Sequence, residues 1–142
     1  MRLAQHSITL HGDIQSAWAK LLDWQNMLDW DEFISSIHFE NPIRVGSTGT
    51  LTVKDNQVFK LRITQVEHLH DYTDEFSILG TRFIFYHRLT QQSSNQLELY
   101  FSIDCEGVLS LFMPLFLAKK FDAQLQATMS KFKTQIEAQS SH

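Results

Sequence analysis

His87 is the ionisable residue whose place in the sequence best suits chemistry. It alternates in phase with Phe83, Phe85 and Leu89, and alternate residues of a strand share a face, so we expect His87 to point into the interior. A buried imidazole can orient a ligand through a hydrogen bond or transfer protons near neutral pH. The plainer alternative is a core histidine that bonds to the backbone or to water. We predict a ligand-orienting role if the interior holds a cavity.

Asp74 and Tyr72 are secondary candidates for acid–base chemistry. Asp74 is in phase with Phe76, and we expect Asp74 and Tyr72 to lie near the mouth of a cavity. Together with His87 they would form the catalytic set of an enzyme that assists enolisation or the loss of water. His6 also alternates in phase with apolar neighbours, so it is a further candidate for the interior.

The other reactive residue types give weaker signals. His68 and His70 resemble a metal-binding pair, but this stretch offers no visible third ligand, and we expect no metal site. Cys105 is the single cysteine, which excludes an intrachain disulfide, and we expect it to be a buried apolar residue. The sequence contains no serine-centred nucleophile turn, phosphate-binding glycine loop or dinucleotide fingerprint, so we expect no cofactor.

Composition limits the class of protein. The chain has 142 residues, with 12 Lys and Arg against 16 Asp and Glu, and its formal net charge is −4. This mild acidity argues against a nucleic-acid partner, since phosphate contacts need clustered positive charge. No apolar run approaches the ~20 residues of a bilayer-spanning helix, and no signal-peptide core opens the chain. We expect one domain over residues 1–142, located in the cytoplasm.

The period of the hydrophobic pattern changes along the chain and predicts the elements. Asp13 is a good N-cap for a first helix, and Pro114 should start or kink the last one. The predicted strands are residues 3–10, 34–40, 50–54, 58–66, 72–79, 82–89 and 97–105, with turns at Asp55-Asn56 and over 91–95; a second short helix covers residues 26–32, and a long amphipathic helix covers residues 115–137.

These elements predict an α+β fold. An antiparallel sheet with one apolar face must bury that face, and the C-terminal helix is the only predicted element long enough to cover it. We expect a strongly curved antiparallel sheet of about six or seven strands wrapped around this helix, with two short helices after the first strand.

Several motifs resemble the START-like, polyketide cyclase/dehydrase and lipid-transport superfamily (SRPBCC), whose members have the helix-grip fold. The motifs are Ile14-Gln15-Ser16-Ala17-Trp18, Leu28-Asp29-Trp30, Pro42-Ile43-Arg44-Val45-Gly46, Phe85-Tyr86-His87-Arg88-Leu89 and Asp104-Cys105-Glu106-Gly107-Val108-Leu109. The resemblance covers nearly the whole chain. It implies a deep apolar cavity between sheet and helix but no common catalytic set, because the superfamily includes ligand carriers, cyclases, hormone receptors and chaperone activators.

The predicted inner face of the sheet is rich in aromatic side chains, which suit a flat apolar ligand. The alternative is that these side chains simply fill the core. With the resemblance, we expect them to line a cavity. The predicted ligand-binding residues are Trp30, Phe59, Leu61, Phe76, Phe83, Phe85, His87, Phe101, Phe112, Met113 and Phe116.

Three regions of the sequence allow more than one interpretation. Trp30 either gates the cavity or plugs the edge of the sheet. The apolar segment 109–117 is expected to form a lid that also packs on the core, with contact to a membrane or a partner protein as the alternative. On the outer face, Ile84, Tyr86 and Tyr100 are predicted to cluster, and such a cluster could support a homodimer rather than a monomer.

We therefore expect the protein to bind or transport a small hydrophobic molecule, such as a lipid, a quinone or a polyketide-like aromatic. The second hypothesis is a cyclase/dehydratase-type lyase that uses His87 as acid and base. The third is a protein-interaction module that docks through residues 109–116 or through the outer face of the sheet.

Overall fold

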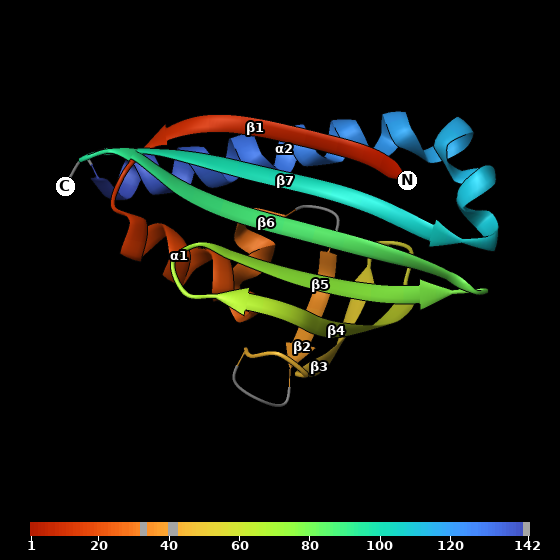
Figure 1. The fold of residues 1–142 in the computed structure, drawn as a ribbon. Helices are drawn as coiled ribbons and strands as arrows, with labels where there is room; N and C mark the ends of the chain where they lie inside the picture. Colours follow the sequence, from red (N-terminus) through yellow and green to blue (C-terminus); the bar gives the residue numbers. More distant parts are fainter. Residues whose placement is uncertain (32–33, 40–42, 141–142) are drawn as a thin grey trace.

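A computed structural model describes residues 1–31, 34–39 and 43–140, and of residues 28–29, 113–116 and 140 it describes the backbone alone (Figure 1). The described residues form one seven-stranded antiparallel sheet in the order β1-β7-β6-β5-β4-β3-β2. The strands are β1 (Arg2–His11), β2 (Ile34–Phe39), β3 (Thr48–Val53), β4 (Val58–Glu67), β5 (Asp71–Ile78), β6 (Thr81–Ser93) and β7 (Gln96–Gly107). The helices are α1 (Ile14–Leu22), the 3₁₀ helices η1 (Trp24–Asp29) and η2 (Val108–Leu111), and the long α2 (Met113–Ser140). The predicted α+β fold class is confirmed.

Alternation along the strands separates an apolar inner face from a polar outer face. Residues that pair directly across neighbouring strands share a face, so the register carries each side chain across the sheet. Tyr72 pairs with His87, His87 pairs with Phe101, and Phe101 pairs with His6. This row lies on the inner face, because Tyr72 is 1% exposed and Phe101 is 4% exposed. His87 and His6 therefore lie on the inner face, as their phase in the sequence predicts.

α1 begins at the predicted cap. The Oδ2 atom of Asp13 accepts a hydrogen bond from the backbone N–H of Ser16 at 3.0 Å, which satisfies one of the free N–H groups of the first turn. The inward stripe of the helix consists of Ala17, Trp18 and Leu21, and all three are buried. The helix is thereby fixed against the end of the sheet where Tyr72 lies.

α2 covers one margin of the sheet. Most of its contacts are with β1, and Figure 1 shows it running along β1 and β7 behind the sheet. Its buried stripe recurs every three or four residues and consists of Leu125, Met129, Phe132 and Ile136. Other elements must therefore cover the rest of the inner face. Within the described part of the chain, no helix is both long enough and apolar enough to cross a membrane.

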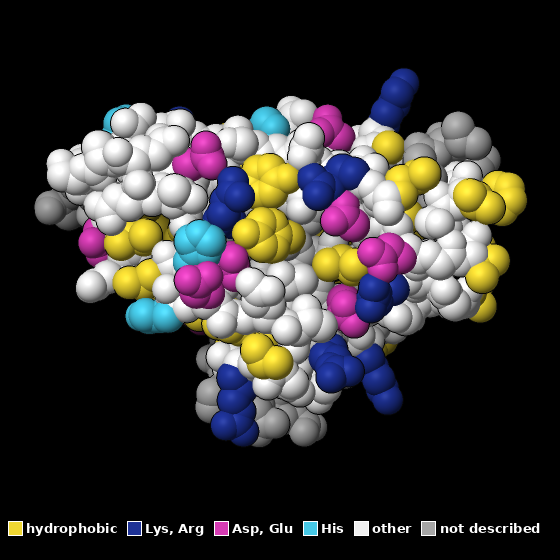
Figure 2. Space-filling model, in the orientation of Figure 1, with side chains coloured by type: hydrophobic (Ala, Val, Ile, Leu, Met, Phe, Trp, Pro, Cys, Tyr) yellow, Lys and Arg dark blue, Asp and Glu magenta, His cyan; other side chains and the backbone are white. Residues whose placement is uncertain are grey.

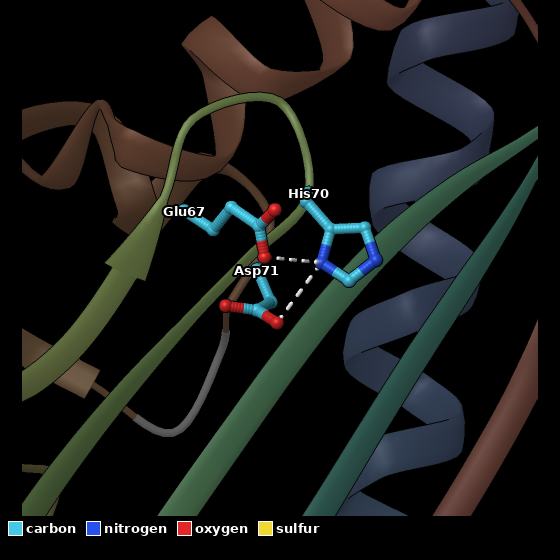
Figure 3. Close-up of side chains that lie close together, drawn as sticks. All are labelled: Glu67, His70 and Asp71. Atoms are coloured by element: carbon cyan, nitrogen blue, oxygen red, sulfur yellow. Dashed lines mark hydrogen bonds and ion pairs between the residues drawn. The ribbon is translucent and has the colours of Figure 1, made fainter.

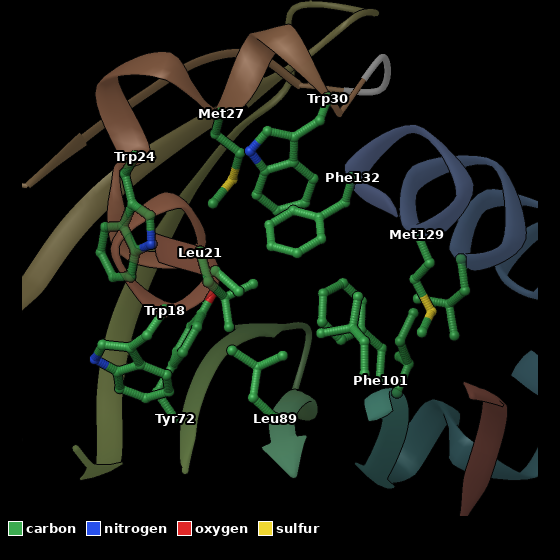
Figure 4. Close-up of a cluster of buried hydrophobic side chains, with 14 of the residues drawn as sticks. Trp18, Leu21, Trp24, Met27, Trp30, Tyr72, Leu89, Phe101, Met129 and Phe132 are labelled. Atoms are coloured by element: carbon green, nitrogen blue, oxygen red, sulfur yellow. The ribbon is translucent and has the colours of Figure 1, made fainter. Parts of the chain in front are cut away.

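An aromatic cluster from α1 and η1 covers the inner face beside Tyr72 (Figure 4). The ring centroids of Trp18 and Trp24 lie 6.4 and 5.9 Å from that of Tyr72. Trp30, which follows η1, packs edge-on against Phe132 of α2 at 5.1 Å. These side chains join the sheet, η1 and α2 into one core at this end of the molecule.

The second short helix differs from the prediction. It is the 3₁₀ helix η1 at Trp24–Asp29 rather than a helix over residues 26–32. Trp24 and Met27 are both buried, and a spacing of three places them on one face of a 3₁₀ turn. The predicted boundaries at residues 32 and 40 lie outside the described residues.

Strand β6 and helix α2 are longer than predicted. β6 continues to Ser93, through most of the expected turn over 91–95, because Gln91 and Ser93 still pair with Leu97 and Gln96 of β7. Backbone pairing at this exposed end of the hairpin needs no apolar side chains, so the pattern gives no sign of it. α2 begins at Met113, which places Pro114 in the first turn, where its missing N–H has no intrahelical partner to lose.

Candidate functional site

His87 lies in a stack of rings on the inner face. Its ring is nearly parallel to that of Tyr72, with 4.1 Å between centroids and 11° between planes, and it meets Phe101 edge-on at 4.7 Å. The Nδ1 atom lies 3.3 Å from the backbone carbonyl oxygen of Tyr72, which suits the tautomer whose Nδ1–H donates. Burial lowers the pKa of His87 to about 4, and the bond to the Tyr72 carbonyl offsets this only in part. The imidazole is therefore neutral at pH 7 and a weak proton donor there.

Asp74 is a buried carboxyl group on the same face. It pairs with Ile63 and Phe85 in the register and is 9% exposed. Its Oδ1 atom is buried and accepts no hydrogen bond from the described residues. Desolvation raises the pKa of Asp74 to about 7, against the opposing effect of its own backbone N–H. Near neutral pH this carboxyl group is divided between its neutral and charged forms.

Tyr72 completes the set of candidate catalytic residues. Burial, and then the charge of Asp74, raise the pKa of Tyr72 well above its ordinary value. The phenol therefore stays protonated at physiological pH. Both residues lie on the inner face of β5, two positions apart, with the His87 ring stacked on the tyrosine.

Four phenylalanine rings extend the inner face away from His87. Phe76 stacks on Phe59 of β4 at 4.6 Å between centroids and on Phe83 and Phe85 of β6 at 5.2 and 5.5 Å. The interplanar angles are 29°, 15° and 22°, so the rings present roughly parallel faces. Phe59, Phe76 and Phe85 are here called the aromatic wall.

The aromatic wall keeps part of its surface exposed, whereas Phe83, Leu61 and Phe101 are buried. Residues on a concave inner face can meet solvent only where no helix covers them. The partial exposure of the wall therefore marks a stretch of the inner face that the described side chains of α2, η1 and α1 cover only in part. Asp74 lies beside this stretch, because its direct partner on β6 is Phe85.

The remaining predicted site residues fall into three groups. Trp30 is 2% exposed and packs on Phe132, the geometry of a plug at the edge of the core. Phe112 is 59% exposed and does not contact the aromatic wall through any ring pair among the described residues. The side chains of Met113 and Phe116 lie outside the described residues.

Exposed apolar side chains gather where the β5–β6 turn meets η2. The turn and η2 are close, since a Cβ on Gly80 would lie 3.8 Å from Val108 Cγ2. The exposed residues of these two segments are Leu79, Val108, Leu111 and Phe112, here called the apolar rim. The segment 109–117 is expected to form a lid, or to contact a membrane or a partner protein. The apolar rim would be the contact surface in each case.

Sequence reasoning missed a hollow of 510 Å³ on the outer face, across β1, β7, β6 and β5. Tyr86 and Tyr100 meet there edge-on at 6.0 Å, which confirms the predicted cluster, and the Arg88 guanidinium lies over the Tyr100 ring at 4.7 Å. Arg2 reaches across to hydrogen-bond the Tyr100 hydroxyl at 2.9 Å. Figure 2 shows this face, with hydrophobic side chains in the middle and charges of both signs around them. No pattern in the sequence links Arg2 to β7, since the two are far apart in the chain.

A second hollow, of 240 Å³, lies at the edge of the sheet between η1 and β2 and is lined by Trp24, Ile37 and Phe39 among others. Neither hollow lies between the sheet and α2. An enclosed cavity at that place stays a prediction, and the partly exposed aromatic wall is the feature of the described inner face that fits it.

Comparison with known proteins relates the chain to others through structure alone. No protein-family model matches the sequence, and no curated protein matches it either. Many solved structures share the fold. Protein XoxI from Bacillus cereus superposes with a TM-score of 0.79 at 14% identity, over 98% of this chain and 98% of that one.

Two further solved structures bear on the predicted resemblance. A START superfamily protein from Mycobacterium smegmatis has a TM-score of 0.77 at 13% identity, over 95% of this chain and 97% of that one. Norcoclaurine synthase from Thalictrum flavum, solved in complex with dopamine and hydroxybenzaldehyde, has a TM-score of 0.68 at 11% identity, over 93% of this chain and 84% of that one. The resemblance to the START-like superfamily is thus confirmed at the level of the fold, and the chain has a helix-grip fold.

Proposed function

We propose that the protein binds a small, flat, apolar molecule against the aromatic wall, with one polar group of the ligand directed to Asp74. The observation that carries the proposal is the partial exposure of Phe59, Phe76 and Phe85 on the concave face, beside a buried carboxyl oxygen that has no partner among the described residues. Of the three ligand classes expected from the sequence, the nearly parallel rings favour quinones and polyketide-like aromatics over flexible lipid chains.

The apolar contact can supply most of the affinity. A fused two-ring ligand that removes roughly 300 Å² of apolar surface from water gains about 7.5 kcal/mol at ~25 cal/mol per Å². Association and ordering oppose this gain by several kcal/mol, so the apolar contact alone supports weak to moderate binding. Specificity must then come from polar contacts.

Asp74 supplies the polar contact. In its neutral form the carboxyl group can donate a hydrogen bond to a carbonyl oxygen of the ligand, and in its charged form it can accept one from a hydroxyl or an amine. Its pKa of about 7 makes both forms accessible near neutral pH. The norcoclaurine synthase of the same fold was solved with two small polar aromatics, and this supports a ligand with a ring and a polar end.

Titration with the neutral fluorescent probe N-phenyl-1-naphthylamine tests the apolar part of the proposal. Wild type should bind the probe, and Phe85→Ala should bind it at least tenfold more weakly. Ile84→Ala is the matched control, because Ile84 is the next residue of β6 and lies on the outer face. Equal affinities for wild type and Phe85→Ala would overturn the proposal, as would a loss confined to Ile84→Ala.

A second candidate function is acid–base catalysis in the same site. The pKa of Asp74 near 7 favours it, since a carboxyl group in an apolar site can act as base and acid at physiological pH. Proton exchange at the α-carbon of 1-tetralone in D₂O, followed by NMR, measures this chemistry directly. A catalyst would accelerate exchange in wild type and lose the acceleration in Asp74→Asn. Exchange at the uncatalysed rate in both proteins would contradict catalysis and leave ligand binding as the proposed function.

A further inference from the structure

We propose that Glu67, His70 and Asp71 form a binding site for a divalent transition-metal ion, with Zn²⁺ as the preferred type. The three residues lie at the β4–β5 turn, and Figure 3 shows their side chains converging on one point. The sequence predicts no site here because the pair His68 and His70 shows no third ligand in this stretch. In the structure the His68 ring packs edge-on against Trp18 at 6.2 Å, and His70 meets two carboxylates instead.

The spacing of the three ligand atoms suits a small cation. His70 Nδ1 lies 3.3 Å from Glu67 Oε2 and 3.0 Å from Asp71 Oδ2. Bonds of about 2.0–2.1 Å to a tetrahedral Zn²⁺ place neighbouring ligand atoms about 3.3–3.4 Å apart. The two carboxylate oxygens lie within 4.8 Å of each other. A cation that replaces the proton between the imidazole and the carboxylates would draw these oxygens to the tetrahedral spacing, and water can take the fourth position.

The surrounding residues hold Asp71 in place. Asp71 is 4% exposed, and its carboxylate accepts hydrogen bonds from Gln65 Nε2 at 3.1 Å and from the Tyr86 hydroxyl at 3.2 Å. Buried carboxylates oriented by such partners are typical of metal sites. The backbone is fixed as well, because His70 N–H bonds to the Glu67 carbonyl at 3.0 Å and Leu89 N–H to the His70 carbonyl at 2.7 Å.

The charges also fit a divalent ion. With a neutral imidazole, the two carboxylates give the cluster a charge of about −2, which one divalent cation balances. Arg88 is opposite Asp71 in the register, but its guanidinium lies over the Tyr100 ring and its Nη2 atom is 3.4 Å from Glu98. One imidazole with two carboxylates suits Zn²⁺, whereas Ca²⁺ and Mg²⁺ prefer sites made of oxygen alone.

The site is separate from the aromatic wall. Asp71 and its partner Tyr86 lie on the outer side of the sheet, and the next residue, Tyr72, points to the inner face. A metal ion here would join the end of β4 to the start of β5. The expected consequence is a higher midpoint of thermal unfolding in the presence of Zn²⁺, because a ligand that binds only the folded state stabilises it.

Isothermal titration of the tag-free protein with ZnCl₂ tests the site, with His68→Gln as matched control for His70→Gln. Wild type and His68→Gln should bind one Zn²⁺ with equal affinity, and His70→Gln should lose this binding. Tyr86→Phe should weaken it roughly tenfold by releasing Asp71. MgCl₂ should give no comparable signal.

Three results would overturn the proposal: no zinc binding by wild type, unchanged binding by His70→Gln, or loss of binding in His68→Gln alone. Because the side chain of Glu67 is 66% exposed, Glu67→Gln is a second variant that should fold as wild type does and should also bind Zn²⁺ more weakly. Thermal unfolding of each variant without metal confirms that it is folded. None of these results depends on whether an apolar ligand binds the inner face.

Discussion

The opposed protonation equilibria of Asp74 and His87 predict a specific dependence of stability on pH. The folded protein keeps a proton on Asp74 up to a pKa of about 7, whereas the unfolded chain releases it near 3.8. Between these values the folded state holds one proton more, so this group lowers the free energy of unfolding as the pH rises. The change is about 1.4 kcal/mol per pH unit and about 4 kcal/mol in total.

His87 acts in the opposite direction. The unfolded chain protonates this imidazole below about 6.5, and the folded protein does so only below about 4. Between these values the unfolded state holds one proton more, so this group lowers the free energy of unfolding as the pH falls, by about 3 kcal/mol in total. In wild type the two slopes nearly cancel between pH 4 and 6.5.

Single substitutions should reveal how each residue makes the free energy of unfolding depend on pH. Urea unfolding at pH 4, 5.5, 7 and 8 gives the free energy of unfolding of each variant relative to wild type. For Asp74→Asn this difference should rise by about 4 kcal/mol from pH 4 to 7 in favour of the variant. For His87→Phe this difference should shift by about 3 kcal/mol in favour of the variant as the pH falls from 6.5 to 4. The free energy of unfolding of the double variant should follow the same pH dependence as that of wild type between pH 4 and 6.5.

The test depends on how each difference in the free energy of unfolding changes with pH, and not on the size of the difference at any one pH. Lost contacts add a constant to each difference and leave its slope unchanged. A difference for Asp74→Asn that does not change with pH would mean that the carboxyl group titrates alike in the folded and unfolded chain. That result would refute the burial of an unpartnered Asp74 and, with it, the polar half of the proposed ligand site.

Three further predictions concern stability alone and are measured by urea or thermal unfolding. Gly107→Ala should destabilise the protein by at least ~2 kcal/mol more than Gly46→Ala. Both glycines have a positive φ, but of the two only Gly107 would bring a Cβ against backbone, at 2.3 Å from the Gly80 carbonyl oxygen. Equal losses of stability in the two variants would contradict the packing at the β6–β7 end. Phe132→Ala should lower the free energy of unfolding by about 3–5 kcal/mol, because its fully buried ring joins α2 to η1, and a loss below 1 kcal/mol would count against that contact. Phe112→Ser should change it by less than about 0.5 kcal/mol, and a large loss would show that this exposed residue of the apolar rim is packed in solution.

The fold was largely predictable because its signals are local. Alternation along each strand places His87 and Asp74 on one face, and Asp13 marks the start of α1 as its N-cap. The end of β6 was not predictable, because Gln91 and Ser93 pair through the backbone at an exposed end and carry no apolar pattern.

The candidate site was predictable in its residue types but not in its coverage. Periodicity tells which face Phe76 and Phe85 occupy, and it does not tell whether a helix covers them. That depends on where α2 packs, and it packs along β1. The cluster around His70 needed the structure as well, since Tyr86, which orients Asp71, is 15 residues away on the neighbouring strand.

Intermolecular NOEs from bound N-phenyl-1-naphthylamine test the ligand-binding site most directly, because they report which protein protons lie close to the bound probe. With ring protons assigned by selective labelling, we predict NOEs to Phe76 and Phe85 on the inner face. NOEs to Tyr86 and Tyr100 in the outer hollow would contradict the account and place the binding surface on the opposite side of the sheet.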